Sequence, residues 1–243
     1  MIAIKEEKIF YDNFFKRTEE IRANQRMFYD DSVKKIPLEL AFKQSGDIKN
    51  KTILCYGQGA NTSILLSFIS RGANVTSIDI SDEAVKMVRE AIKDKDRCKV
   101  MQMNAEKMSF RKDSFDVVFG RAILHHLDIN KAAKEIHRVL KSGGKAIFIE
   151  PLGNNPLINL YRYCTQSDRT KDEHPLRHCD FVILKKYFRY MYHRNFFLLS
   201  LIAIVFKPVK KTLKALIKLD EFIFRMFPFI DKYAWCTVIT LEK

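Results

Sequence analysis

Residues that can do chemistry recur just after short apolar runs in the first half of the chain. Gly57 and Gly59 follow one such run, Asp79 lies at the end of the next, and His125 and His126 follow a later one. Glycines let the backbone approach a ligand closely, and an acid can accept both hydroxyls of an adenosine ribose. An imidazole can take up a proton near neutral pH. The pattern therefore indicates a nucleotide-like ligand with a proton-transfer group beside it.

Two further signals have the same placement. Asn104, Ala105 and Glu106 follow the apolar run at residues 99–103, where a short polar side chain could read an adenine amino group. Arg121 follows the next run. Each signal alone is also compatible with an ordinary turn or a solvated surface. The evidence for a ligand site is that the signals occur in order at the ends of successive apolar runs.

A dinucleotide site is the first alternative, because an acid such as Asp79 also suits the ribose of NAD. The dinucleotide motif G-x-G-x-x-G needs a third glycine for close packing of helix on strand. Thr62 occupies that position. The sequence therefore disfavours NAD.

These signals need a parallel sheet, which brings the carboxyl ends of its strands to one edge. Apolar runs alternating with helical segments predict such βαβ units. Ser81 is expected to cap the second of the helices. The strands are expected at residues 52–56, 74–80, 99–103, 115–119, 145–150, 196–206 and 235–241, and the helices at 64–70, 82–91, 130–140, 179–192 and 207–228.

The composition is that of a folded protein. The chain has 243 residues, of which 47% are hydrophobic and 30% charged, so a disordered chain is excluded. Its formal net charge of +14 favours anionic partners without choosing among small molecules, acidic lipids and nucleic acid. Five widely spaced cysteines without a C-x-x-C pair argue against disulfides and structural zinc, and a reducing cytoplasm is expected.

The segments ILCYGQGANTS, VTSIDIS, MNAEKMSF, SFDVVFGRAILHHL and EIHRVLKSGGKAIFIEP together resemble class I S-adenosylmethionine-dependent methyltransferases. The likeness covers a little under half of the chain, and it is greatest to the small-molecule branch that includes ubiquinone and menaquinone biosynthesis enzymes. It implies a Rossmann-like, doubly wound, mostly parallel seven-stranded sheet with an antiparallel last strand. Residues 1–48 are expected to form a helical cap and residues 49–243 the methyltransferase domain, with a substrate loop at about 151–180 and a basic helical insert at about 207–230.

The resemblance also implies a cofactor, S-adenosyl-L-methionine, which would leave as S-adenosyl-L-homocysteine. No metal is expected. Two departures from the family pattern stand out: Cys55 replaces an acid, and Asn61 replaces a third glycine. The implied cofactor residues are Tyr56, Gly57, Gly59, Asn61, Asp79, Ile80, Asn104, Ala105, Glu106 and Arg121.

The acceptor is expected to be a small molecule, methylated at oxygen. A weak oxygen nucleophile needs a base, and His125, His126 and His174 are the candidates. The irregular stretch after residue 150 and the aromatic N-terminal segment suggest substrate contacts. The residues proposed for these contacts are Tyr11, Tyr29, Asn154, Arg169 and Glu173.

Two other functions stay open at this level. The positive charge alone would suit a nucleic-acid methyltransferase, although no recognised RNA-binding module is present. Loss of the acid at Cys55 would suit a non-catalytic module with a decayed cofactor site.

The basic helix at 207–228 either packs on its own domain or contacts an acidic membrane or lipid-linked substrate, which would place the protein at the inner membrane face. The oligomeric state is left open.

Overall fold

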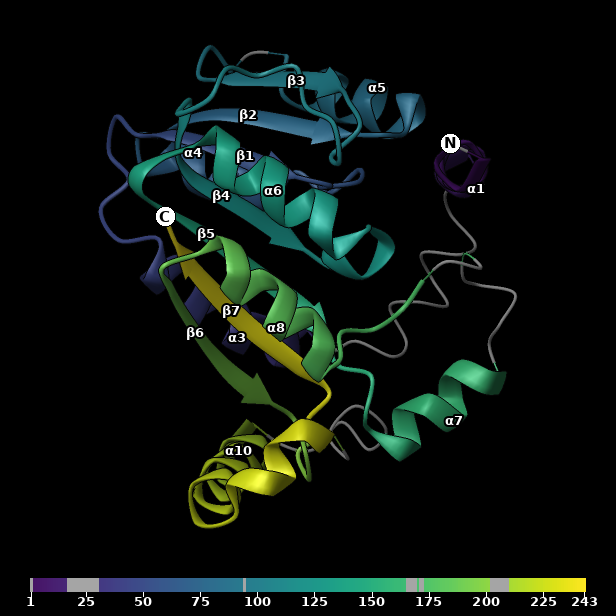
Figure 1. The fold of residues 1–243 in the computed structure, drawn as a ribbon, viewed down its shortest axis with the longest axis vertical. Coiled ribbons are helices and arrows are strands. Elements are labelled where there is room, and N and C mark those ends of the chain that lie inside the picture. Colours follow the sequence, from purple (N-terminus) through teal and green to yellow (C-terminus); the bar gives the residue numbers. More distant parts are fainter. Residues whose placement is uncertain (1, 17–30, 94, 165–169, 171–172, 202–209) are drawn as a thin grey trace.

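A computed structural model describes residues 2–16, 31–93, 95–164, 170, 173–201 and 210–243. Seven strands form one sheet in the order β3-β2-β1-β4-β5-β7-β6 (Figure 1). β7 runs antiparallel to both of its neighbours, and the remaining pairs are parallel. The order reverses between β1 and β4, which is where an open α/β sheet leaves a crevice for a ligand. The predicted mostly parallel sheet with an antiparallel last strand is therefore confirmed.

The elements follow the predicted alternation closely. Ser81 caps α5 as expected, its side chain accepting a hydrogen bond from the Ala84 N–H. The strands are β1 (Thr52–Tyr56), β2 (Asn74–Asp79), β3 (Cys98–Gln102), β4 (Phe115–Arg121), β5 (Leu140–Pro151), β6 (Tyr190–Phe196) and β7 (Cys236–Glu242). The helices are α1 (Ile2–Lys16), α3 (Asp31–Gln44), α4 (Ser63–Ser70), α5 (Asp82–Ala91), α6 (Ile129–Val139), α7 (Pro156–Cys164), α8 (His178–Tyr187) and α10 (Lys210–Met226), with short 3-10 turns η1 (Leu124–His126) and η3 (Pro228–Tyr233).

Side chains alternate along each strand, so successive residues point to opposite faces of the sheet. Helices cover both faces and bury these side chains. From β1, Leu54 and Tyr56 enter the core under α6 and α8, whereas Ile53 and Cys55 enter the core under α3, α4 and α5. Figure 1 shows α6 and α8 in front of the sheet and α3 and α4 behind it. This two-sided packing fixes the loops that leave the carboxyl ends of the strands.

Three predicted elements differ from the observed ones. The expected strand at 196–206 is wrong over its described part: β6 ends at Phe196, and Phe197 has a left-handed backbone with φ 68°. The expected helix at 179–192 ends at Tyr187, because its last residues begin β6. Residues 156–164 of the expected irregular loop form α7. For β6 the pairing with β7, which is distant in the chain, decides the structure, and local patterns do not reveal it.

Candidate functional site

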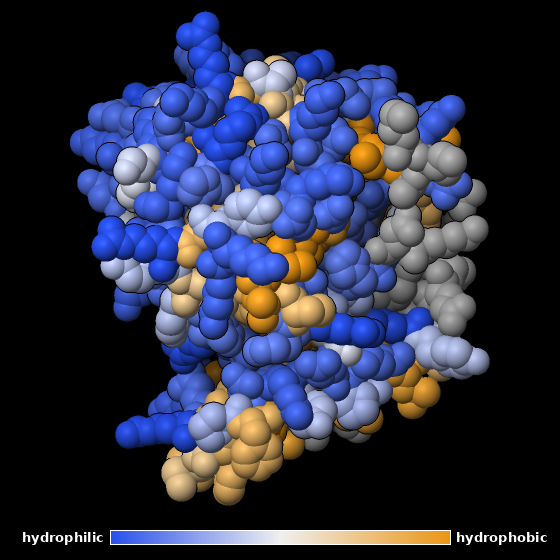
Figure 2. Space-filling model, viewed as in Figure 1, coloured by the Kyte–Doolittle hydropathy of each residue, from blue (hydrophilic) through white to orange (hydrophobic). Residues whose placement is uncertain are grey.

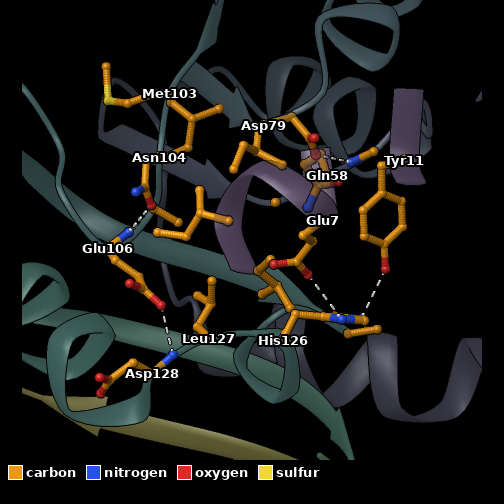
Figure 3. A pocket seen from close by; sticks show the side chains of 18 of the residues that line it. Glu7, Tyr11, Gln58, Asp79, Met103, Asn104, Glu106, His126, Leu127 and Asp128 are labelled. Atoms are coloured by element: carbon orange, nitrogen blue, oxygen red, sulfur yellow. Dashed lines mark hydrogen bonds and ion pairs between the residues drawn. The ribbon is translucent and has the colours of Figure 1, made fainter. Parts of the chain in front are cut away.

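A cavity of about 560 Å³ lies at the carboxyl edge of the parallel strands, a size typical of small-molecule sites. Its walls come from the loops after β1, β2, β3 and β4, and α1 contributes Glu7 and Tyr11 (Figure 3). The lining residues are Ile4, Glu7, Tyr11, Phe15, Gly57, Gln58, Gly59, Ile78, Asp79, Ile80, Met103, Asn104, Ala105, Glu106, Arg121, Ala122, Ile123, His126, Leu127, Asp128, Lys131 and His174.

The glycine loop and Asp79 form one wall. Gly57 has φ +62°, and a Cβ built on it would lie 2.4 Å from the Ile123 side chain, so the loop needs glycine there. Asp79 accepts hydrogen bonds from the backbone N–H groups of Gly59 (2.7 Å) and Ser81 (2.9 Å). Burial raises the pKa of Asp79 above its usual value, while these N–H groups oppose the shift. The carboxylate is thus held rigidly with acceptor capacity to spare.

The opposite wall is held by a chain of hydrogen bonds. Tyr56 is fully buried and donates its hydroxyl to the Ala105 carbonyl at 2.7 Å. The Asn104 side chain accepts from the Glu106 N–H at 2.8 Å, and Glu106 in turn accepts from the Asp128 N–H at 2.8 Å. These contacts fix the loop after β3 against the loop after β4, as Figure 3 shows.

Helix α1 presents one face to the cavity and another to α5. Ile4, Glu7, Tyr11 and Phe15 recur at helical spacing and line the cavity. On the other face, Asp12 accepts from the Ser81 hydroxyl at 2.6 Å, at the amino end of α5, where the helix dipole favours an acid. Lys8 and Lys16 pair with acids of the first turn of α5. Polar contacts therefore anchor this lid.

His126 connects the lid to the loop after β4. Its Nε2 lies 3.1 Å from the Tyr11 hydroxyl, and its Nδ1 lies 3.2 Å from Glu7 Oε1. Burial, with Glu7 adding to it, raises the pKa of Tyr11 well above its usual range, so this phenol keeps its proton. Tyr11 therefore donates to Nε2, and Nδ1–H donates to the Glu7 carboxylate.

His125 lies behind His126, outside the cavity lining, with the two ring centroids 4.1 Å apart. Its Nδ1 lies 2.8 Å from Glu150 Oε2, while Glu150 Oε1 accepts from the N–H groups of Ile123 and Leu124 at 3.0 Å each. Glu150 is 1% exposed. This buried carboxylate fixes the turn that carries both histidines.

The buried state of His125 predicts a loss of stability in acid. Burial lowers the pKa of His125 below its ordinary value of 6.5, so the unfolded chain takes up this proton more readily. The free energy of unfolding should therefore fall as the pH drops below 6.5, by at most about 1.4 kcal/mol per pH unit for this group. Burial lowers the pKa values of His137 and His193 in the same direction.

Urea titrations at about pH 7.5 and about pH 5.5 measure the effect. The difference in unfolding free energy between the two pH values should be smaller in His125→Asn than in the unmodified chain. An identical difference would show that His125 does not contribute.

His125, His126 and Glu173 also place one potential metal-ligand atom each within 4.8 Å of one another. Imidazoles with a carboxylate suit transition metals. Both nitrogens of His126 already have partners, so a metal could bind through this ring only if Glu7 or Tyr11 moved away. We therefore consider His126 below for proton transfer and not as a metal ligand.

The cavity suits an adenosyl group with a charged tail. Gln58 Nε2 is buried without a hydrogen-bond partner among the described residues, which leaves a donor for a ligand oxygen. Asp79 lines the same cavity and has the acceptor capacity that ribose hydroxyls require. Ile78, Ile80 and Met103 provide apolar surface for a base.

The structure gathers most of the predicted cofactor residues but not all of them. Asn61 is exposed, accepts two hydrogen bonds from Ser63, and is not among the residues with positive φ, so this position needs no glycine. Tyr56 does not line the cavity, and its hydroxyl supports the cavity wall by donating to the Ala105 carbonyl. Cys55 lies fully buried in the core under α4, away from the cavity lining, so its thiol makes no contact there.

The predicted substrate residues are more dispersed. Tyr11 lines the cavity, and Glu173 belongs to the cluster with His125 and His126. Asn154 lies between β5 and α7 and does not line the cavity. Tyr29 and Arg169 fall outside the described residues. His174 lines the cavity, and its N–H donates to the His125 carbonyl.

Sequence reasoning missed Glu7, Phe15 and Gln58. The first two share the helical spacing of Tyr11, and the spacing 4, 7, 11, 15 is the signal that identifies them. Gln58 stands inside the glycine motif, where any residue is allowed, so its type carries no signal.

The strand order, the antiparallel β7, the glycine loop and the acid at the end of β2 fit a class I S-adenosylmethionine-dependent methyltransferase domain. Residues 54–148 match the family model described as methyltransferase domain. The cofactor of this class is S-adenosylmethionine.

Relatives support this assignment over part of the chain. The demethylmenaquinone methyltransferase of Lactococcus lactis is 32% identical over 125 residues, 49% of this chain and 49% of that protein. The sterol 4-C-methyltransferase strm-1 of Caenorhabditis elegans is 31% identical over 38% of this chain and 29% of its own length. The chain thus spans about half the length of these relatives, or less.

Solved structures share the fold. Phosphoethanolamine N-methyltransferase 2 of Haemonchus contortus, bound to S-adenosylhomocysteine, has a TM-score of 0.67 at 21% identity, over 96% of this chain and 60% of that one. Geranyl diphosphate C-methyltransferase of Streptomyces coelicolor has a TM-score of 0.61 at 14% identity, over 86% and 79% of the two chains.

Proposed function

We propose that this chain transfers the methyl group of S-adenosylmethionine to a small organic acceptor at an atom that loses a proton, a hydroxyl oxygen being our choice. One observation carries the proposal: a single cavity is lined by the predicted cofactor groups, Gly57, Gly59 and Asp79, and by the imidazole of His126. The bound cofactor supplies an activated methyl group, so the protein mainly positions the partners and excludes water.

The residues divide this work. Asp79 and the Gln58 amide bind and orient the polar parts of the cofactor. The lid residues Tyr11 and Phe15 exclude water. His126 Nε2 accepts the proton of the acceptor in place of the Tyr11 hydroxyl, and Glu7 stabilises the imidazolium that results. His174 stands as a second imidazole at the same cavity.

The names of the relatives support a small acceptor without fixing its atom. Two of the names cited above specify methylation at carbon and one at nitrogen. Proton removal by His126 would serve oxygen and an activated carbon alike. The chain's surplus of positive charge favours an anionic or lipid-linked acceptor. A cytoplasmic setting belongs to the same proposal, because all five cysteines are free thiols.

Radiolabelled S-adenosylmethionine tests this function. The chain is incubated with the cofactor, an organic extract of cells and total RNA, and the label is then followed by solvent partition. We expect acceptor-dependent label in the small-molecule fraction, and mass spectrometry and NMR of that product identify the methylated atom. Label confined to RNA would contradict the proposal in favour of a nucleic-acid methyltransferase.

A further inference from the structure

Helix α10 has two apolar faces, and only one of them packs on the protein. Leu213 is buried, and Ile217 and Phe224 pack against the two cores. Asp220, 2% exposed, accepts hydrogen bonds from the N–H groups of residues 198–200 and fixes the helix in this orientation. The inner face of α10 therefore packs on the protein's own domain, which is one of the two alternatives expected from the sequence.

A second apolar stripe lies on the outer side of the same helix. Phe222 points directly away from the inner face at 100° per residue, with Leu219 and Met226 beside it. Phe222 is 58% exposed and Met226 56%. The stripe continues past the end of α10 into η3, where Phe229 is 68% exposed. We call the exposed side chains of Leu219, Phe222, Met226, Phe227 and Phe229 the outer stripe.

Helix α7 adds apolar side chains at the same end of the molecule. Asn155, just before α7, donates to the Tyr233 carbonyl of η3 at 2.6 Å, so the two elements are held side by side. Leu157, Leu160 and Tyr163 of α7 are exposed. Figure 2 shows apolar surface over α10 and η3 and again over α7, at the lower end of the view. Monomeric proteins rarely expose this many large apolar side chains together.

The charges beside the outer stripe are basic. Lys214, Lys218 and Arg225 are exposed along one flank of α10. The acids of the helix do not offset them, because Asp220 is turned inward and Glu221 pairs with Arg194 at 2.6 Å. Phenylalanines flanked by basic side chains on a helix that lies along the surface form the pattern of interfacial membrane attachment.

We propose that the outer stripe, with the basic flank of α10, binds the surface of an acidic lipid bilayer. Aromatic side chains enter the headgroup boundary, and each nearby lysine or arginine gains from anionic lipid. A second copy of the chain fits less well, because a twofold pairing would bring the basic flanks of both copies to the same interface. Within the described residues no helix is both long and apolar enough to cross a membrane, so attachment would be peripheral.

The proposal also bears on the site. α7 follows the carboxyl end of β5, at the edge of the sheet where the cavity lies, and η3 leads into β7 beside it. Both α7 and η3 therefore lie at the same edge of the sheet as the cavity. Attachment itself is independent of the proposed methyl transfer, and it can be measured with neither cofactor nor acceptor present.

Flotation with phosphatidylcholine vesicles, with and without phosphatidylglycerol, tests the proposal. The unmodified chain should float with the phosphatidylglycerol vesicles, stay behind with pure phosphatidylcholine, and be released by high salt. The double variant Phe222→Ser/Phe229→Ser should lower the partition coefficient at least about tenfold. Tyr190→Ser is the matched control, because Tyr190 is 56% exposed at the start of β6 and lies outside the outer stripe.

Binding of S-adenosylhomocysteine by the double variant, measured by calorimetry, shows that it is folded and separates this proposal from the proposed function. Equal flotation of the double variant and the unmodified chain would overturn the proposal. So would failure of the unmodified chain to float with acidic vesicles, or a dimer in sedimentation that the same substitutions dissociate.

Discussion

Replacing Asp79 with alanine should weaken the binding of S-adenosylhomocysteine about ten- to hundredfold, the cost of losing charge-assisted hydrogen bonds in a partly desolvated site. The carboxylate is the acceptor that we assign to the ribose hydroxyls. It also holds the Gly59 and Ser81 N–H groups, so its removal loosens the glycine loop as well. Isothermal titration calorimetry measures the change directly.

The neighbouring acid Asp82 provides the control for this substitution. Asp82 stands three residues later in the first turn of α5, pairs with Lys8, and does not line the cavity. Asp82→Ala should leave the affinity nearly unchanged. Asp79→Asn keeps the shape of the side chain but turns an NH₂ group toward one of the two backbone donors, so it should also weaken binding. Equal affinities for Asp79→Ala and Asp82→Ala would remove Asp79 from the site.

Replacing His126 with alanine should lower the rate of methyl transfer about 10²- to 10⁴-fold at saturating cofactor, the range for loss of a general base. The acceptor is the molecule labelled in the extract experiment. The affinity for S-adenosylhomocysteine should change far less than the rate, because our assignment gives His126 to the acceptor. Single-turnover rates and calorimetry on the same preparation separate the two effects.

Three other substitutions make this prediction specific. Tyr11→Phe removes the hydroxyl that donates to His126 Nε2 and keeps the ring, so its effect on the rate should be smaller. His174→Ala removes the other imidazole of the cavity and should have little effect. His125→Asn should act mainly on stability, because His125 is buried behind the cavity. A His126→Ala enzyme that keeps the unmodified rate would show that this imidazole is not the base.

The sheet and its glycine loop could be predicted because local signals and long-range packing agree there. The apolar run of β1, the glycines after it and the Ser81 cap each favour the structure that the whole sheet requires. The acid at the end of β2 lies at the cavity for the same reason. Motif spacing in a parallel sheet translates directly into position at one edge.

Other parts depend on contacts that no local pattern reveals. The run after residue 196 is apolar enough for a strand, yet β6 ends there, because β7 pairs with the more polar residues 190–196 instead. The partners of His126 come from α1, more than a hundred residues away. The sequence placed His125 and His126 on equal terms, whereas in the structure His125 packs against Glu150 and His126 lines the cavity.

The departure at Cys55 illustrates the same limit. From sequence, a thiol in place of an acid raises the question of a decayed cofactor site. In the structure the Cys55 side chain points into the apolar core on the far side of β1, and burial raises the pKa of the thiol well above its usual value. Asp79 and Gln58 line the cavity without any contribution from Cys55.

Calorimetric titration of S-adenosylhomocysteine into the unmodified chain tests whether the cavity binds the adenosyl cofactor. We expect saturable binding of one molecule per chain with a dissociation constant on the order of micromolar. The melting temperature should also rise as the ligand concentration increases. No heat of binding and no thermal shift up to about 1 mM ligand would contradict the assignment of this cavity to the cofactor.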